Sequence, residues 1–313
     1  MTSPPPPTKV VAFGGGRGLA ASLTALSRLD NIDLTAVVTV ADDGGSSGQI
    51  RATRTVLPPG DLRKALIATA DPKKSGLSET FGYRFAGDDF LTGHPVGNIV
   101  LTALLERYPN PVDALDNVAA TLGCRARILP MANERLDIEA DIRSGDTTTR
   151  VRGQHHIAIS SGVVGNVRLT PDTAEPCPEA TKAIRDADWH IFGPGSWYTS
   201  VIPHLMLPKL RSVIADSSAH RAVVVNLAEE TETAGLSLPG HLHALADFAD
   251  GVRFHYVIAD DTRCSNEVES LNLAAQALSA QLVTGHIAAE ETSHDPLALA
   301  KVLGNLLHDE GGS

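Results

Sequence analysis

Two glycine-rich turns near the start of the chain most constrain its fold. The first, Gly14-Gly15-Gly16-Arg17-Gly18, follows the apolar run Lys9-Val10-Val11-Ala12-Phe13, and the second, Asp42 to Gly48, follows Leu34 to Val40. Short runs of this kind, rich in β-branched residues, are typical of buried parallel strands. Between them, leucines recur every three or four residues from Leu19 to Leu29, which is helical spacing. The chain is therefore predicted to begin with a β-α-β unit.

The same alternation returns later in the sequence. A helical segment from Glu179 to Ala187 precedes the apolar run Trp189 to Phe192, and further runs cover Ala222 to Asn226 and Phe254 to Asp260. Strands that alternate with helices predict an α/β protein with a Rossmann-like, doubly wound, mostly parallel sheet and helices on both faces.

The middle of the chain has a different pattern. Short runs at Ala126–Pro130, Leu136–Ile142 and His155–Ile159 are expected to be strands, and the second alternates apolar with polar residues. Such alternation indicates a small antiparallel flap with one solvated face. The predicted organisation is a disordered proline-rich tail at 1–8, one α/β domain at 9–308 and a frayed tail at 309–313. Within that domain lie an excursion at roughly 71–95 and the flap at roughly 125–169.

Composition excludes several classes of protein. The formal net charge of −11 comes without a basic patch, so nucleic acid is not an expected partner. The sequence contains neither a signal peptide nor an apolar stretch long enough to span a membrane. Cys124, Cys177 and Cys264 lie far apart without a C-x-x-C pair. They fit a reducing cytoplasm better than disulfides or a zinc site, so a soluble cytoplasmic protein is expected.

The first turn, Gly14 to Gly18, is a candidate anion site because glycine lets backbone N–H groups approach a ligand closely at a helix amino terminus. It departs from the dinucleotide fingerprint, since Leu19 stands where the third glycine belongs, and it lacks the G-K-[S/T] of a P-loop. A nicotinamide-dependent oxidoreductase is therefore disfavoured. A tight turn without a ligand remains the alternative for this segment alone.

Asp42 and Asp43 end the second predicted strand, where an acidic residue can bind a ribose hydroxyl or hold Mg²⁺. Because successive strand side chains alternate, one of the two is expected to reach a given ligand. Both could instead cap the next helix. The residues that follow, Gly44, Gly45, Ser46 and Ser47, supply N–H and hydroxyl donors and favour the ligand-binding interpretation.

A third turn, Gly193-Pro194-Gly195-Ser196, ends the Trp189 to Phe192 run. Ser196, Thr199 and Ser200 place three hydroxyls close together, which resembles another anion site, although a helix cap would also use one of them. Ser196 is not in a G-x-S-x-G motif, so it is not expected to be a hydrolase nucleophile.

Side chains at the ends of other predicted elements complete the set of candidates. Asn98 and Asn226 either contact a base or sugar or act as caps, and His94 lies in a glycine-bounded loop near the predicted cleft. Arg17, Arg51 and Arg63 are candidates for neutralising phosphate. Arg63 is the weakest, because it is expected on the exposed face of a helix that starts at Leu62 with Asp61 as its cap.

Five motifs in order carry a resemblance to a known family: Gly14-Gly15-Gly16-Arg17-Gly18-Leu19, Thr39 to Gly48, Pro58-Pro59-Gly60-Asp61-Leu62-Arg63, Gly93-His94-Pro95-Val96-Gly97-Asn98, and Gly193 to Pro203. They resemble the YvcK-type gluconeogenesis factors of bacteria, within the wider CofD-like superfamily. The likeness covers most of the chain from Lys9 to about Asn226 and extends more loosely to Leu307.

The resemblance implies a cytoplasmic, dimeric protein that binds a UDP-sugar, UDP-N-acetylglucosamine, without an established reaction. It implies a regulatory role in cell shape and peptidoglycan synthesis during gluconeogenic growth, together with a protein partner in cell-wall synthesis. The CofD branch implies the alternative: a Mg²⁺-dependent 2-phospho-L-lactate transferase that acts on a deazaflavin, with Asp42 or Asp43 holding the metal. No other cofactor is implied.

Two positions depart from the family pattern. Many relatives have a Gly-Glu-Thr turn where this chain reads Asn226-Leu227-Ala228-Glu229-Glu230-Thr231, and an arginine is often present where Ser293 stands. The hypothesis is a nucleotide-sugar pocket in which the glycine turns hold the diphosphate. Its predicted residues are Gly14, Gly15, Gly16, Arg17, Gly18, Asp42, Asp43, Gly44, Gly45, Ser46, Ser47, Asn98, Gly193, Pro194, Gly195, Ser196, Thr199, Ser200 and Asn226.

Overall fold

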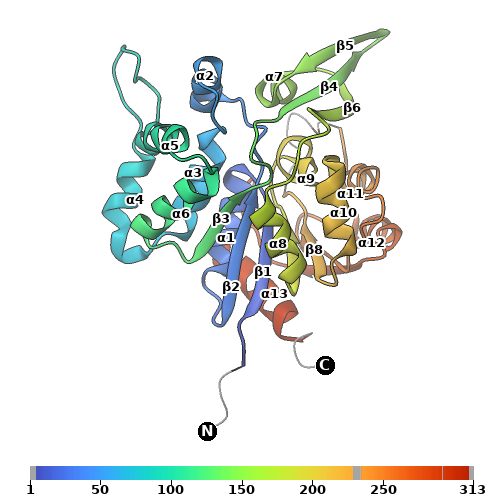
Figure 1. Cartoon of the computed structure of the whole chain (residues 1–313). Helices are drawn as coiled ribbons and strands as arrows, with labels where there is room; N and C mark the ends of the chain where they lie inside the picture. The colour runs from blue at the N-terminus through green and yellow to red at the C-terminus, as the bar shows by residue number, and fades with distance from the viewer. Residues whose placement is uncertain (1–4, 228–232, 234, 291, 310–313) are drawn as a thin grey trace.

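Seven parallel strands form the main sheet of the computed structural model, which describes residues 5–227, 233, 235–290 and 292–309. The strands are β1 (Thr8–Gly14), β2 (Ile32–Val38), β3 (Ala126–Pro130), β7 (Trp189–Phe192), β8 (His220–Val224), β9 (Tyr256–Asp260) and β10 (Gln281–Gly285). Their order is β10-β9-β8-β7-β1-β2-β3, and each pair of neighbours is parallel. The predicted doubly wound α/β fold is confirmed (Figure 1).

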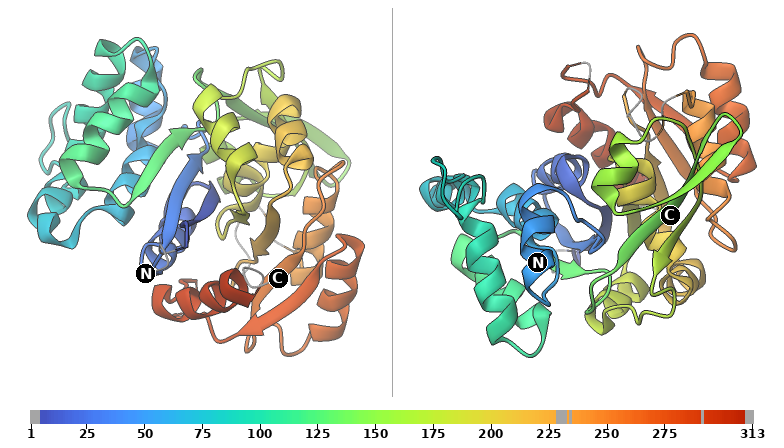
Figure 2. Two further views of the ribbon diagram at one scale, coloured as in Figure 1. Left: turned by 60° about the horizontal axis from the view of Figure 1, so that its bottom comes forward. Right: turned by 90° about the horizontal axis from the view of Figure 1, so that it is seen from above.

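Helices cover both faces of this sheet. The first half of the chain contributes α1 (Gly16–Leu26), α2 (Gly45–Thr53), α3 (Pro59–Thr69), α4 (Ser75–Gly82), α5 (Val96–Arg107) and α6 (Pro111–Leu122), with a 3₁₀ turn at Pro72–Lys74. The second half contributes α8 (Pro178–Asp186), α9 (Pro203–Met206), α10 (Pro208–Asp216), α11 (Leu238–Ala246), α12 (Val268–Ala277) and α13 (Pro296–Asp309), with a π-helical turn at Trp197–Val201. α1 packs between α3 and α13, whereas α8 packs against α10 (Figures 1 and 2).

Burial on both faces explains why the central strands are continuously apolar. Val10 to Phe13 of β1 and Trp189 to Phe192 of β7 are all buried, and the Phe13 and Phe192 rings stack with centroids 4.4 Å apart. Burying large apolar side chains provides most of the favourable free energy of such a core. The core therefore fixes β1 beside β7.

The chain reverses direction across the sheet between β1 and β7. From β1 it proceeds through β2 to β3 on one side, and from β7 through β8 and β9 to β10 on the other. In open α/β sheets, this switch point leaves a crevice at the carboxyl ends of the two strands, where ligands bind. The first and third glycine turns end β1 and β7 and so flank this crevice.

The antiparallel flap differs from the prediction in its strands. It contains β4 (Asp137–Ser144), β5 (Thr147–Arg152) and β6 (Val163–Thr170) in the order β5-β4-β6. Ala126–Pro130 instead pairs with β2 in the main sheet, because its buried side chains continue the core. The prediction of a strand at His155–Ile159 was wrong: the segment lies in helix α7 (Gln154–Ile159).

Several predicted boundaries also shift. Thr8, placed in the tail, pairs with Ile32 as the first residue of β1. α3 starts at Pro59 and not at Leu62, because proline is well tolerated at the first helical position, so Asp61 lies inside the first turn and is no cap. α5 starts at Val96, which places Asn98 within the helix. α13 includes Asp309, and residues 310–313 lie outside the described part of the chain.

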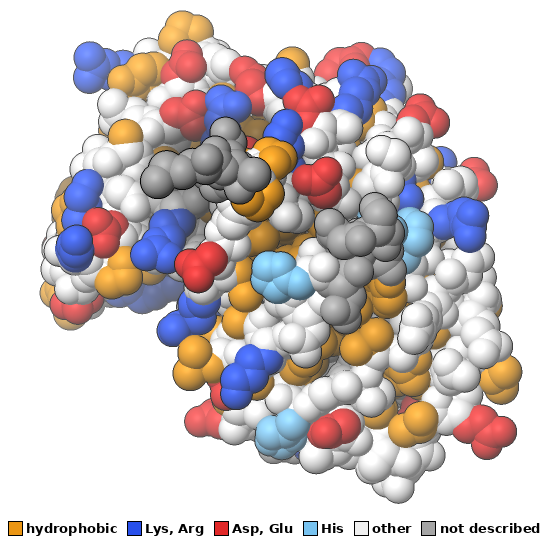
Figure 3. Space-filling model, turned by 90° about the horizontal axis from the view of Figure 1, so that it is seen from below, with side chains coloured by type: hydrophobic (Ala, Val, Ile, Leu, Met, Phe, Trp, Pro, Cys, Tyr) orange, Lys and Arg blue, Asp and Glu red, His pale blue; other side chains and the backbone are white. Residues whose placement is uncertain are grey.

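None of the helices in the described residues is both long and apolar enough to cross a membrane. At the face formed by the amino ends of the strands, lysine and arginine side chains are mixed with aspartate and glutamate (Figure 3). That face therefore does not present the continuous basic surface that nucleic acid would need. The glycine turns lie at the opposite end of the sheet, the one viewed from above in Figure 2.

Candidate ligand-binding site

The β1 turn and the β7 turn touch each other. A Cβ atom on Gly18 would lie 2.1 Å from the Pro194 carbonyl oxygen, and the Ser22 hydroxyl donates to the Gly193 carbonyl oxygen at 2.6 Å. Only glycine allows so close an approach at position 18. The two halves of the sheet are thus joined directly beneath the crevice.

Asn226 follows β8 and holds the β7 turn. Its Oδ1 accepts from the Gly195 N–H at 2.9 Å and its Nδ2 donates to the Gly195 carbonyl oxygen at 3.0 Å. Both amide groups are therefore bonded to the backbone. Asn226 orients the turn, and because Oδ1 can accept and Nδ2 can donate once more, its contact with a ligand stays a prediction.

A cavity of about 290 Å³ opens beside these turns. Arg17 and Gly18 line it from α1, Pro194 and Gly195 from the β7 turn, and Asn226 from the end of β8. The carboxyl-terminal segment adds Glu290, Thr292, Ser293 and His294. Arg17 is exposed in the first turn of α1, where it can reach a ligand in the cavity.

Two aspartates from different motifs meet behind the β1 turn. A Cβ on Gly15 would lie 2.5 Å from Asp61 Oδ2, and a Cβ on Gly60 would lie 2.7 Å from Asp42 Oδ2 and 2.4 Å from the Ser47 hydroxyl. Asp61 Oδ1 accepts from Lys64, whereas the buried Oδ2 has no hydrogen-bond partner among the described residues. Glycines at 15 and 60 thus make room for a compact carboxylate pair.

The two carboxylates repel each other. Burial, followed by the nearby charge of Asp61, raises the pKa of Asp42 from 3.8 to about 6. Hydrogen bonds from the Gly44 N–H and the Ser47 hydroxyl act in the opposite direction without cancelling this rise. A cation or a hydrogen-bond donor brought to the pair would relieve the repulsion.

Asp43 points elsewhere. A Cβ on Gly153, at the end of β5, would lie 1.9 Å from Asp43 Oδ2. Asp42 therefore faces α3 and Asp43 faces the flap, which agrees with the expectation that only one of these neighbours reaches a given ligand. Of the two, Asp42 is the one that lies beside Asp61 and Gly60.

Arg51 connects the Asp42 turn to the flap. Its guanidinium donates to the carbonyl oxygens of Asp42 at 3.0 Å and Leu136 at 2.9 Å, and forms an ion pair of 2.6 Å with Asp137. The interpretation of Arg51 as a phosphate-neutralising residue was wrong, because these buried groups already occupy its nitrogens. Arg51 is a positioning residue.

Ser46, His94 and Asn98 form a buried cluster at the start of α2 and α5. Ser46 Oγ lies 2.7 Å from His94 Nδ1 and accepts from Asn98 Nδ2 at 2.9 Å. Which of Ser46 Oγ and His94 Nδ1 donates depends on the tautomer of the imidazole. Asn98 is 2 % exposed, and its Oδ1 is unbonded among the described residues. This enclosed oxygen therefore lacks a hydrogen-bond donor from the described part of the chain.

The hydroxyls after β7 lie at different depths. Thr199 and Ser200 are buried in the π-helical turn, and the Ser200 hydroxyl would lie 3.3 Å from a Cβ on Gly15. Ser196 precedes the turn without providing a side-chain cap. Ser200 is thus the hydroxyl of this loop that packs against the β1 turn.

Four helices begin around the carboxylate pair. The residues that precede α1, α2, α3 and α5 provide no side-chain cap, although in α3 the Gly60 N–H donates to the Ser47 hydroxyl at 3.0 Å. Uncapped first turns leave backbone N–H groups and the positive end of the helix dipole free for an anion. Gly16 is the first residue of α1, Gly45 is the first residue of α2, and Gly44 immediately precedes α2. The site therefore combines anion-binding helix ends with two acidic side chains.

Asp260, at the end of β9, fixes the carboxyl-terminal wall of the cavity. Its Oδ2 accepts from the N–H groups of Ile287 and Ala288, each at 2.8 Å, and its Oδ1 accepts from Thr262 and Arg263. Burial raises the pKa of Asp260, but these hydrogen bonds outweigh it and lower the pKa to about 2. Asp260 with Asp261 and His286 also forms a possible cation cluster, yet its buried member is already fully hydrogen-bonded.

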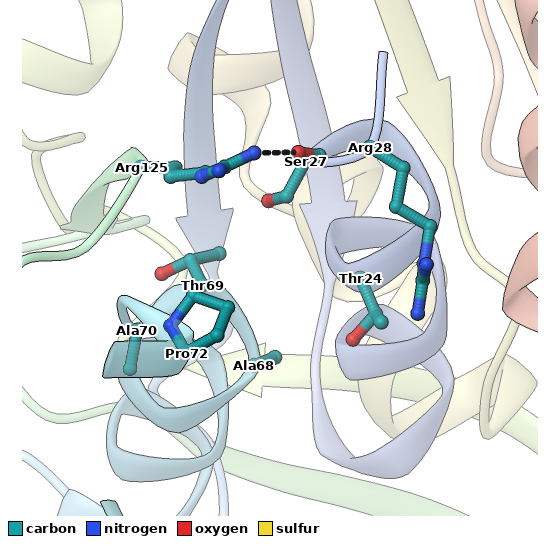
Figure 4. Close-up of a pocket in the computed structure, with 8 residues that line it drawn as sticks. All are labelled: Thr24, Ser27, Arg28, Ala68, Thr69, Ala70, Pro72 and Arg125. Atoms are coloured by element: carbon teal, nitrogen blue, oxygen red, sulfur yellow. Dashed lines mark hydrogen bonds between the residues drawn. The ribbon is translucent and has the colours of Figure 1, made fainter. Parts of the chain in front are cut away.

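A separate cavity of about 280 Å³ lies at the other end of α1 and α3. Figure 4 shows Arg125 reaching across it to donate to the Ser27 carbonyl oxygen at 2.8 Å, while Arg28 and Thr24 project from the α1 side. Thr69 and Thr24 also donate to backbone carbonyls. This cavity lies toward the amino ends of the strands, where doubly wound proteins do not bind their ligands.

Three contributors to the site were missed or misjudged in the sequence. Asp61 was taken for a cap, and Arg63 was expected to be exposed but is 6 % exposed. His294 was not among the candidate residues, yet it lines the cavity. The Pro-Pro-Gly before Asp61 was the available signal, because a helix starting at proline buries residues 61 and 63. The departure from the family pattern at 228–232 lies outside the described residues, whereas Ser293 is part of the cavity wall.

The fold and its turns define a doubly wound α/β protein with a glycine-lined crevice at the switch point. Comparison with known proteins agrees. Residues 10–292 match the family model described as "2-phospho-L-lactate transferase CofD". A Mycobacterium tuberculosis protein named "Putative gluconeogenesis factor" is 45 % identical, over 97 % of this chain and 92 % of that protein. The Gluconeogenesis factor of Bacillus subtilis is 31 % identical, over 96 % of this chain and 98 % of its own.

A solved structure shares the whole architecture. The crystal structure of a UPF0052 family member from Bacillus halodurans aligns with a TM-score of 0.85 at 28 % identity, covering 96 % of this chain and 100 % of that one. The chain therefore belongs to the CofD family, and its relatives include the gluconeogenesis factors.

Proposed function

We propose that the chain is a cytoplasmic regulatory protein that binds UDP-N-acetylglucosamine or a related nucleotide sugar in the crevice between the β1 and β7 turns. The observation that carries this proposal is the contact of Gly18 with Pro194 at the switch point, beside a cavity that Arg17 lines. Glycine turns and an uncapped helix start provide N–H groups for a diphosphate. The cavity beyond them has room for part of a sugar or base.

The predicted contacts divide between the two walls. Gly14 to Gly18 with Arg17 would bind the diphosphate, Asp42 would accept from a ribose hydroxyl, and Asn98 Oδ1 would accept from a further hydroxyl. Gly193 to Ser200 would close the other side. The relatives named gluconeogenesis factors support a role in gluconeogenic growth. Control of cell shape and peptidoglycan synthesis through a protein partner is a further part of the proposal. A dimer is part of this proposal.

Isothermal titration with UDP-N-acetylglucosamine tests the proposal, with UDP as a competitor. Arg17→Gln should weaken binding roughly tenfold, because a charge-assisted contact to phosphate is lost. Arg28→Gln is the matched control, since Arg28 is also exposed but follows the far end of α1. Absence of heat together with absence of competition by UDP, even at high ligand concentration, would refute the proposal.

The carboxylate pair favours a second candidate function, a Mg²⁺-dependent transfer of a phosphorus-containing group to a deazaflavin. The residues fit a magnesium ion, because Asp42 and Asp61 supply hard oxygen ligands and the buried Asp61 Oδ2 has no described partner. Mg²⁺ held there would neutralise charge on the transferring phosphate oxygens. Asp43, the other residue predicted for this role, faces the flap instead.

Metal-dependent turnover distinguishes the two candidates. A transferase should consume a deazaflavin acceptor only with Mg²⁺, and Asp61→Asn should reduce that turnover by at least roughly a hundredfold. A binding protein should bind the nucleotide sugar equally well with and without Mg²⁺ and show no turnover. Asp43→Asn serves as the matched carboxylate control.

A further inference from the structure

Arg63 is a buried arginine with no bonded partner. It is 6 % exposed, and among the described residues its guanidinium makes no hydrogen bond and no ion pair. Its Nε is fully enclosed. Its terminal nitrogens are not enclosed and have no partner among the described residues, so they are open to an anion, which would offset the cost of covering a charge that arginine keeps. The position of Arg63 is therefore unexplained by the fold alone.

The Arg63 side chain runs along the amino end of α5. Its Cδ lies 2.9 Å from where a Cβ on Gly97 would stand, so Gly97 makes room for it. Asp61, two residues earlier, faces Gly15 instead. Residues two apart lie on nearly opposite sides of a helix. Arg63 thus leaves α3 on the side away from the β1 turn, between α3 and α5, which pack together (Figure 1).

A second arginine approaches the same place. Arg84, in the loop after α4, donates to the Gly93 carbonyl oxygen at 2.8 Å, next to His94. Burial, and then the positive charge of Arg84, lower the pKa of Arg63, while Asp61 acts on it through space in the opposite direction. Two like charges and the positive end of the α5 dipole therefore converge with no ion-paired carboxylate from the described residues.

The neighbouring polar atoms indicate the kind of anion. Asn98 follows Gly97 in the same turn of α5, and its buried Oδ1 needs a hydrogen-bond donor. A phosphate in its protonated form, or a phosphorylated sugar, offers acceptor oxygens and a hydroxyl donor together. A plain carboxylate offers only acceptors.

We propose that Arg63, Arg84 and the amino end of α5 form a phosphate-binding site separate from the glycine turns, on the opposite side of α3 from Gly15. The site binds inorganic phosphate or the phosphate group of a larger ligand. None of these three elements belongs to the β1 or β7 turn, so the site is linked to the nucleotide-sugar proposal only through Asn98, whose Oδ1 both proposals use.

Thermal unfolding of the full chain in sodium phosphate, compared with sodium acetate and sodium chloride at equal ionic strength, tests the site. Phosphate should raise the Tm saturably, as expected for a ligand of the native state, and acetate should raise it less. Arg63→Gln should weaken phosphate binding roughly tenfold or more. Arg84→Gln, which alters an exposed residue and so keeps the fold, should weaken it by a smaller factor.

Arg221→Gln is the matched control, because Arg221 is also buried but its terminal nitrogens donate to the carbonyl oxygens of Ile214, Ser217 and Arg253. It should lower the Tm in chloride yet keep the response to phosphate. Arg63→Gln should not lower the Tm in chloride, since it removes an unpaired buried charge. The proposal would be overturned if phosphate raised the Tm of Arg63→Gln as much as that of the wild type. It would also be overturned if Arg63→Gln lowered the Tm in chloride as much as Arg221→Gln does.

A competition arm identifies the source of the phosphate. UDP-N-acetylglucosamine is titrated into the chain with and without saturating phosphate. Unchanged affinity shows that the site at Arg63 takes free phosphate or another ligand, and reduced affinity shows that it takes a phosphate of the nucleotide sugar itself. If the nucleotide sugar does not bind at all, the nucleotide-sugar proposal fails. The Tm measurements in phosphate, acetate and chloride still test the phosphate site in that case.

Discussion

The two halves of the molecule contain the same three kinds of buried polar residue, an aspartate, an asparagine and an arginine, but bond them differently. In the carboxyl-terminal half, Asp260, Asn226 and Arg221 direct their side chains to backbone groups. In the amino-terminal half, Asp61, Asn98 and Arg63 each keep a buried polar atom without a partner among the described residues, as does Nε of Arg221 in the other half. The terminal nitrogens of Arg221 are bonded, whereas those of Arg63 are not.

This difference separates scaffold from binding surface. Buried polar groups are nearly always hydrogen-bonded, so the unbonded atoms that lie together on α3 and α5 mark a place that a ligand completes. The carboxyl-terminal residues fix the shape of one wall. The amino-terminal residues offer donors and acceptors from the other. Substitutions in the first set should reduce stability, and those in the second should mainly reduce binding.

The largest effect is expected where the two walls touch. Gly18→Ala should destabilise the fold by about 3 kcal/mol and abolish ligand binding, because its methyl group would overlap the Pro194 carbonyl. Urea denaturation measures the first effect and calorimetric titration the second. Gly76→Ala in α4 is the control, since a Cβ there meets no atom within 4 Å. Equal stability of the two variants would show that the walls do not need this contact.

Asp260→Asn should destabilise the fold by about 2 kcal/mol at neutral pH, since it removes a carboxylate that four residues stabilise. The folded pKa, about 2, lies below the unfolded value of 3.8, so the wild-type advantage is complete above pH 4 and is lost as the pH falls toward 2. Unfolding free energies of both proteins across this range measure it. A difference independent of pH would contradict the assigned role.

Asp42→Asn should stabilise the fold at neutral pH, whereas Asp260→Asn should destabilise it. The folded pKa of Asp42, about 6, lies above 3.8, so ionisation costs wild-type stability as the pH rises from 4 through 6. The variant should match wild type near pH 4 and exceed it by about 1 to 2 kcal/mol at pH 7. The same variant should bind a nucleotide sugar less well. Loss of stability at pH 7 would mean that Asp42 belongs with the scaffold residues.

The two asparagines provide the smallest and sharpest contrast. Asn226→Ala removes two hydrogen bonds to Gly195 and should cost about 2 kcal/mol, whereas Asn98→Ala removes one bond to Ser46 and should cost about 1 kcal/mol. The Asn98 variant should nevertheless lose at least as much ligand affinity. Urea unfolding curves measure the stability of both variants, and calorimetric titrations measure their ligand affinity. Equal losses of affinity and stability in both would erase the distinction between the walls.

The sequence predicts the sheet better than it predicts the site. Buried parallel strands such as Val10 to Phe13 leave an unmistakable apolar run, and glycine turns mark where they end. The flap is harder, because β4 and β5 alternate polar with apolar residues and His155–Ile159 has the composition of a strand, although it forms helix α7. Local pattern does not settle which partner such a segment packs against.

The site eludes prediction where a long-range contact decides the role of a residue. Asp61 and Arg63 read as a cap and a surface arginine if the helix starts at Leu62. Starting it at Pro59 turns Asp61 toward Gly15 and Arg63 toward Gly97. Arg51 reads as a phosphate ligand until Asp137, 86 positions away, is seen beside it. The spacing of residues within the motifs predicts none of these long-range contacts.

The connection that Arg51 makes between the Asp42 turn and β4 offers a practical means of observation. Any shift of that turn must either move the flap or break hydrogen bonds to the Asp42 and Leu136 carbonyls. Thr148 is exposed at the tip of the flap, while Cys177 and Cys264 are buried and Cys124 is partly covered. A cysteine engineered at position 148 would therefore accept a fluorophore preferentially, and its emission would report, in real time, what occupies the crevice below.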